Sequence, residues 1–279
     1  MIVDFHTHIF PKQIRAKREK FFSSEPEFEL LYSRPGAKMA GAGDLIEVMD
    51  EQRIDVAVIF GFPWKNSNTF KQHNDYILEA VEKYSNRLVG FSCFDYFSEE
   101  AVEEAVRCLN NGLVGIGELA VYQTGIDELS VRKLEPIMDI CREQNRPILF
   151  HTNEPVGYAY PGKAPMSLNQ VYALIKKFPD NTIVLAHWGG GIFFFNLAKK
   201  EVKESFKNIY FDTAASPYTY DSDIYRIALQ VVDREKILLG SDFPLLNPNR
   251  YFEELKSSGI SPSEIESICG GNAARLLNL

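Results

Sequence analysis

Two histidines separated by a single residue stand near the start of the chain, in the apolar segment Ile2–His8. Such a segment predicts a buried strand, and alternate side chains of a strand point to the same side. We therefore expect His6 and His8 to share a face with Asp4, and Phe5 to lie on the opposite face. Two imidazoles on one face can bind one metal ion through their ring nitrogens, so this pair is a candidate metal site.

Ligand-type side chains also close four later segments of strand length. These residues are Glu118, His151, His187 and Asp242. Histidine and carboxylate ligands together suit Zn²⁺, and also Mn²⁺, Fe²⁺ or Co²⁺. Each residue taken alone is better explained as a polar group at a strand end, so the prediction depends on whether the fold brings them together.

Eight short apolar segments recur along the chain at regular intervals. Most are continuous and rich in Ile, Val, Leu and Phe, which is typical of strands buried on both faces of a parallel sheet. The segments cover residues 2–8, 56–62, 88–94, 115–121, 147–152, 182–188, 209–215 and 237–243.

Helical patterns lie between these segments. In the clearest one, Ser98 is a candidate N-cap, Val102 and Leu109 lie on the apolar face, and Gly112 ends the helix. The other predicted helices cover residues 45–52, 74–84, 131–144, 168–178, 192–206, 223–232 and 265–277. This alternation predicts an α/β fold, either a (β/α)₈ TIM barrel or a large doubly wound sheet.

No low-complexity linker or change in composition divides the chain, so we expect residues 1–279 to form one barrel domain. The longest connection covers residues 9–43, and a loop of that length is usually a lid or a binding loop. Residues 153–167 and 215–222 form the next longest connections, and both follow a predicted strand. Because the active site of a barrel lies at the carboxyl ends of its strands, the candidate ligands are expected to converge there.

Composition excludes several other classes of protein. The formal net charge of -8 argues against a nucleic-acid partner, because contact with phosphates needs clustered Lys and Arg. No apolar run approaches the roughly 18 residues that a membrane span needs, and no basic region precedes the first apolar segment. The four cysteines are scattered, which is typical of a reduced protein, so we expect a cytoplasmic enzyme. Few insertions beyond a minimal barrel favour a small-molecule substrate over a polymer. The sequence leaves the oligomeric state open, a homodimer included.

At these residues the chain resembles the amidohydrolase superfamily, and most of all the branch that includes aminocarboxymuconate-semialdehyde decarboxylase and many metal-dependent hydrolases. The similar segments are residues 2–8, 87–91, 184–191, 240–244 and 271–277, which together span nearly the whole chain. The resemblance implies the barrel fold, and it implies a principal metal ion. The residues that it implies as ligands of that ion are His6, His8, His151 and Asp242. It also implies that His187 either polarises the substrate or binds a second ion.

Glu118 departs from the pattern of the decarboxylases. A carboxylate on the fourth strand is typical of relatives in which it binds or bridges metal ions, so it favours hydrolysis and leaves one or two ions open. In that hypothesis Asp242 is the general base and then the general acid, and His187 stabilises the oxyanion of an ester, lactone or amide. Zn²⁺ is the expected ion. The alternatives are decarboxylation or hydration of a small unsaturated acid, and an inactive barrel that serves as a binding protein.

The substrate contacts follow from residues close to the predicted strand ends. Lys163 and Tyr160 lie in the connection after His151, where Lys163 is expected to meet a substrate carboxylate, and Trp188 is expected to line the pocket. The alternative for Lys163 is a solvated loop tip. His73 stands among polar residues at the start of a predicted helix and is expected to be solvated.

Overall fold

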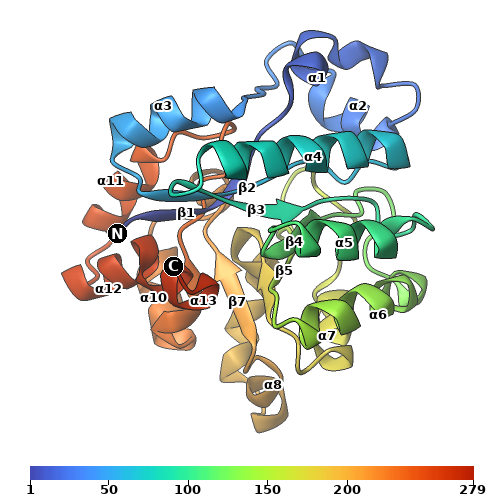
Figure 1. Cartoon of the computed structure of the whole chain (residues 1–279). Coiled ribbons are helices and arrows are strands. Elements are labelled where there is room, and N and C mark those ends of the chain that lie inside the picture. The colour runs from blue at the N-terminus through green and yellow to red at the C-terminus, as the bar shows by residue number, and fades with distance from the viewer.

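The computed structural model describes all residues 1–279 and consists of eight parallel strands surrounded by helices (Figure 1). Each strand pairs with the next one along the chain. The strands are β1 (Val3–His8), β2 (Val56–Phe60), β3 (Leu88–Ser92), β4 (Gly115–Leu119), β5 (Ile148–Phe150), β6 (Ile183–Leu185), β7 (Ile209–Asp212) and β8 (Ile237–Leu238). The predicted (β/α)₈ barrel is therefore confirmed, and the doubly wound sheet is wrong.

The barrel closes between the first and the last segments. The backbone N–H of Phe5 donates to the carbonyl of Leu239 at 2.7 Å, and that of Asp242 donates to the carbonyl of His6 at 2.9 Å. Thr7 and Phe243 form one further parallel bridge. Strand β8 nevertheless ends at Leu238, five residues earlier than predicted, and farther along the chain Asp242 adopts a φ of 59°.

Strand β1 contains an irregularity that decides which side chains reach the mouth of the barrel. Asp4 pairs with Ala57, whereas Thr7 pairs with Ile59, so three steps along β1 oppose two steps along β2. An extra residue of this kind is a bulge, and it shifts the alternation of faces by one position.

The bulge makes the predicted facing of β1 wrong in two respects. Phe5 packs inside the barrel in a cluster of buried strand residues, with its ring 5.7 Å from that of Phe91. Asp4 points away from the two histidines, and its carboxylate accepts hydrogen bonds from the backbone N–H and the hydroxyl of Ser241. His6 lies within the irregular stretch and His8 lies beyond it, and both face the mouth, with their Nε2 atoms 3.2 Å apart.

Helices cover the outside of the barrel. They are α3 (Ala42–Gln52), α4 (Ser67–Lys83), α5 (Ala101–Asn110), α6 (Glu128–Glu143), α7 (Leu168–Lys177), α8 (Lys200–Ser205), α9 (Ser216–Thr219), α10 (Ile224–Val231), α11 (Asn249–Ser257), α12 (Pro262–Glu266) and α13 (Asn272–Leu277). Short helical turns η1 (Arg18–Lys20), η2 (His187–Leu197), η3 (Arg234–Lys236) and η4 (Ser267–Gly271) complete the structure. None of the helices combines the length and the apolar character needed to cross a membrane.

One predicted helix and one predicted loop have a different structure from the one expected. The helix predicted over residues 192–206 is divided between the end of η2 and α8, because Ala198 and Lys199 between them are extended. The long connection over residues 9–43 is partly helical and contains α1 (Lys12–Ala16), η1 and α2 (Pro26–Tyr32). It folds against the barrel through Phe28, whose ring centroid lies 4.4 Å from that of Trp64.

Candidate metal centre

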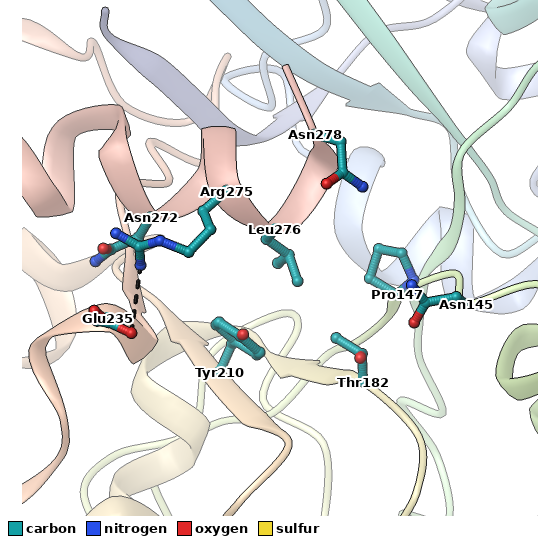
Figure 2. A pocket seen from close by; sticks show the side chains of 9 residues that line it. All are labelled: Asn145, Pro147, Thr182, Tyr210, Glu235, Asn272, Arg275, Leu276 and Asn278. Atoms are coloured by element: carbon teal, nitrogen blue, oxygen red, sulfur yellow. Dashed lines mark ion pairs between the residues drawn. The ribbon is translucent and has the colours of Figure 1, made fainter.

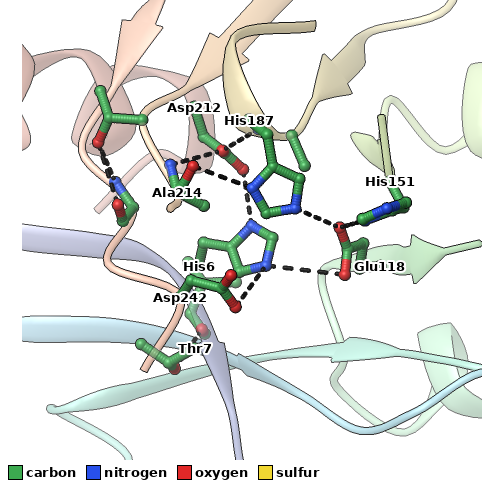
Figure 3. A network of polar contacts seen from close by, with 12 residues as sticks. His6, Thr7, Glu118, His151, His187, Asp212, Ala214 and Asp242 are labelled. Atoms are coloured by element: carbon green, nitrogen blue, oxygen red, sulfur yellow. Dashed lines mark hydrogen bonds and ion pairs between the residues drawn. The ribbon is translucent and has the colours of Figure 1, made fainter. Parts of the chain in front are cut away.

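Glu118, in strand β4, lies between two pairs of histidines, and Figure 3 shows three of the four, His6, His151 and His187, around its carboxylate. Its Oε2 lies 3.7 Å from Nε2 of His6 and 3.6 Å from Nε2 of His8. Its Oε1 lies 3.0 Å from Nδ1 of His151 and 3.5 Å from Nε2 of His187. The six nitrogen and oxygen atoms form two groups of potential metal ligands that share one carboxylate. The histidine pairs are called the first pair (His6, His8) and the second pair (His151, His187) below.

Asp242 lies next to the first pair. Its Oδ1 lies 3.7 Å from Nε2 of His6 and 3.5 Å from Nε2 of His8. The turn that follows β8 places it there, and Ser241, which is held by Asp4, fixes this turn. The structure thus brings together all six residues that the sequence analysis selected for the centre.

The backbone of β4 is adapted to this position of Glu118. Gly117, directly before it, has a φ of 130°, and a side chain there would collide with the backbone carbonyl of Leu149 in β5. Only glycine combines this conformation with so close an approach of a neighbouring strand. The glycine before Glu118 in the Gly-Ile-Gly-Glu segment is therefore required for steric reasons, which the apolar pattern of the segment does not show.

Each of the four imidazoles has one nitrogen facing the centre and the other facing an oxygen outside it. For the first pair, Nδ1 of His6 lies 2.8 Å from Oδ2 of Asp212, and Nδ1 of His8 lies 3.1 Å from the carbonyl of Gly61. For the second pair, the outer partners are the carbonyls of Gly162 for His151 and of Ala214 for His187, at 2.8 and 2.9 Å. A ring that donates its outer N–H keeps an unprotonated inner nitrogen, which is the form that binds a metal. The donor set and its outer partners therefore fit a divalent metal ion.

The electrostatics of the centre favour added positive charge. Burial opposes a charged imidazole at His6, but the carboxylates of Asp212 and Glu118 outweigh it and raise its pKa to about 10. Burial also opposes the charge of His187, yet Glu118 and Asp242 raise its pKa to about 9. Burial would raise the pKa of Asp242, but His8 and His6 lower it to about 2. Divalent cations would satisfy this excess of buried carboxylate charge.

Asp212 also belongs to the centre, although it is not among the residues predicted from the sequence. It ends β7, is 0% exposed, and uses Oδ1 to accept hydrogen bonds from the backbone N–H groups of His187 and Ala214. The available signal was an acidic residue at the end of Ile209–Asp212. The predicted strand ran on to residue 215 and so placed Asp212 in its middle.

Three residues with a predicted role in substrate binding lie outside the centre, and that role stays a prediction. The hydroxyl of Tyr160 and the Nζ of Lys163 donate to the carboxylate of Glu154 at 2.8 and 3.0 Å, which closes their loop on itself. Trp188 is 0% exposed and donates from Nε1 to the hydroxyl of Ser216 at 2.9 Å. A direct contact of its ring with substrate would therefore require this packing to change.

His73 is buried, so its predicted solvation is wrong. It is 1% exposed, it accepts a hydrogen bond from Nε1 of Trp64 at 2.8 Å, and its Nε2 donates to the carbonyl of Ile9 at 2.7 Å. Helix α4 begins at Ser67, seven residues earlier than predicted, so His73 lies inside the helix rather than before it. There it packs against the connection after β1. Tyr122 lies beside the second pair, with its ring centroid 5.0 Å from that of His151.

A separate polar pocket of about 230 Å³ lies at the amino ends of the strands (Figure 2). Its lining includes Thr182 before β6, Glu235 before β8, and Arg275 of α13, which forms an ion pair of 3.6 Å with Glu235. The centre lies at the carboxyl ends, where the active sites of barrel enzymes are found. We therefore assign the chemistry to the centre and none to this pocket.

Comparison with known proteins agrees with this geometry. The amidohydrolase family model matches residues 3–279, so the chain belongs to that family. It is 23% identical to 2-amino-3-carboxymuconate-6-semialdehyde decarboxylase of Dictyostelium discoideum, over 99% of this chain and 91% of that protein. The crystal structure of 5-carboxyvanillate decarboxylase from Sphingomonas paucimobilis has a TM-score of 0.78 at 14% identity, over 100% of this chain and 99% of that one.

A dihydroxybenzoic acid decarboxylase from Polaromonas, with bound manganese, has a TM-score of 0.71 at 18% identity, over 100% of this chain and 97% of that one. At such low identity the two solved structures show the fold alone. The chain is an amidohydrolase-superfamily enzyme, and its candidate His and Glu ligands support a divalent metal ion.

Proposed function

We propose that this enzyme is a metal-dependent hydrolase that cleaves an ester, lactone or amide bond in a small molecule. The observation that supports this proposal is the position of Glu118, whose two oxygens face different histidine pairs. A carboxylate shared in this way suits two metal ions side by side, an arrangement common in hydrolytic metal sites. His6, His8 and Asp242 would hold one ion, His151 and His187 the other, and Glu118 would contact both.

Divalent ions in this place would polarise the substrate carbonyl and lower the pKa of water towards about 7. The protein residues divide the remaining work. Oδ1 of Asp242 lies beside the first pair, where it accepts the proton of the attacking water and later returns it to the leaving group. If only one ion is bound, Nε2 of His187 is free to donate a hydrogen bond to the developing oxyanion, in keeping with its raised pKa.

Zn²⁺ is the ion that we propose first, because imidazole and carboxylate ligands of this kind are those of catalytic zinc sites. Mn²⁺ is the alternative, since the same donors accept it. The solved decarboxylase from Polaromonas has bound manganese.

Decarboxylation of a small carboxylic acid is the second candidate, and the comparisons favour it over hydrolysis. The curated relative and the solved structures named above are decarboxylases. The first pair with His151 and Asp242 would then hold one ion, and Glu118 would be a hydrogen-bond partner of His151 rather than a bridge. The two reactions differ in their products, because only decarboxylation releases CO₂ without consuming water.

Metal content and product analysis together test the proposal. We would measure metal per chain by plasma mass spectrometry, with His6→Ala/His8→Ala as the control that should lose the first ion. About two ions per native chain, and ¹⁸O from labelled water in the product of an ester or lactone panel, would support hydrolysis. One ion and release of CO₂ from a panel of aromatic and unsaturated acids would replace it with decarboxylation.

A further inference from the structure

A series of buried hydrogen bonds connects Glu118 with the outer helices α4 and α5. Cys93, directly after β3, donates from Sγ to the backbone carbonyl of Glu118 at 3.0 Å. Asn74 of α4 accepts a hydrogen bond from the backbone N–H of Cys93 through Oδ1, also at 3.0 Å. Cys93 is 1% exposed and Asn74 is 0% exposed, so water does not compete for these bonds.

The outer end of the series is fixed by an ion pair. Nδ2 of Asn74 donates to Oε1 of Glu104 at 2.8 Å, and Arg107 donates to both oxygens of Glu104, each at 2.8 Å. Burial would raise the pKa of Glu104, but the hydrogen bonds from Arg107 and Asn74 lower it below its ordinary value. The amide of Asn74 is thereby held in one orientation, with its nitrogen towards a carboxylate and its oxygen towards a backbone N–H.

We propose that Cys93 and Asn74 are positioning residues that hold Glu118 midway between the two histidine pairs. The inference rests on the proposed function, in which Glu118 serves both pairs. The geometry leaves little tolerance, because Oε2 lies 3.6 Å from His8 while Oε1 lies 3.5 Å from His187. A displacement of about 1 Å would favour one pair and release the other, and outer partners of metal ligands often control affinity in this way.

Substitutions of two equally buried cysteines provide a matched test. Cys93→Ala removes the donor to Glu118, whereas Cys141→Ala removes a sulfur that is also 1% exposed but packs in the apolar cluster around α6. We would measure the dissociation constants of Zn²⁺ and Mn²⁺ by competition with a chelator, together with the thermal unfolding midpoint. We expect Cys93→Ala to weaken binding of at least one ion about 10-fold and Cys141→Ala to bind as the native chain does. Cys93→Ser should restore most of the affinity, because a hydroxyl can donate to the same carbonyl.

Native metal affinity in Cys93→Ala would overturn the inference, and so would an equal loss in Cys141→Ala, since the effect would then be one of stability. If Cys93→Ala does not fold, Asn74→Ala replaces it, with the same loss expected and native affinity again overturning the inference. A native chain that binds metal but yields no hydrolysis product would overturn the proposed function alone. The difference between the two cysteine variants would still decide the positioning role.

Discussion

Asp212 and His6 form the shortest polar contact made by the side chains of the first histidine pair, with Oδ2 of Asp212 2.8 Å from Nδ1 of His6 and both side chains fully buried. Because Nδ1 donates to this carboxylate, Nε2 of His6 is left to face Glu118 and His8. The same carboxylate holds the backbone of His187 through its other oxygen. One residue of β7 therefore orients a member of each histidine pair.

Replacing Asp212 tests this dependence. In Asp212→Asn the side chain keeps its size but loses its charge, and it cannot accept from His6, His187 and Ala214 at once. We expect metal affinity to fall roughly 10- to 100-fold, measured by chelator competition. The exposed Asp180→Asn is the control, and affinity equal to that of the native chain in Asp212→Asn would show that His6 needs no such partner.

Glu118→Gln tests whether one carboxylate serves two ions. The amide retains the volume of the side chain but is a much weaker ligand, so we expect bound metal to fall from about two ions per chain to about one. The remaining ion should be the one near the first pair, where Asp242 still supplies a carboxylate. Two ions retained in Glu118→Gln would contradict the shared arrangement.

The residues of this site that could be predicted from the sequence are those that lie at the ends of strands. Buried parallel strands read as continuous apolar runs, and barrels collect the residues that follow them, so Glu118, His151, His187 and Asp242 could be selected from the sequence. The bulge in β1 could not, because it depends on register against β2 rather than on local pattern.

Asp212 and His73 escaped prediction for a related reason. Both are polar residues whose partners lie far away in the sequence, at His6 and at Trp64 and Ile9. A buried polar side chain looks solvated in a sequence until the fold supplies the group that satisfies it.

The loop after β5 offers a prediction about Lys163. Its Nζ and Oε1 of Glu154 lie 3.0 Å apart, with the side chains only 14% and 18% exposed. If the ion pair shapes the loop, Lys163→Ala and Glu154→Gln should raise KM by similar factors, and the double variant should add little to either. If Lys163 binds a substrate carboxylate as predicted, only its own replacement should raise KM strongly. Steady-state kinetics of the three variants separates the two roles.

His73 predicts a pH dependence of the free energy of unfolding. Burial lowers its pKa from an ordinary value of 6.5 to about 4, so the unfolded chain binds more protons than the folded one between these values. The contribution of neutral His73 to the free energy of unfolding is therefore fully present above about pH 6.5. This contribution, on the order of 3 kcal/mol, is lost as the pH falls towards 4. His73→Gln retains a donor for the carbonyl of Ile9 and an acceptor for Trp64, but it does not titrate. Urea unfolding of the native chain and of this variant should thus give a difference in unfolding free energy that changes between pH 7 and pH 4.5, and a constant difference would show that His73 is not held neutral by its burial.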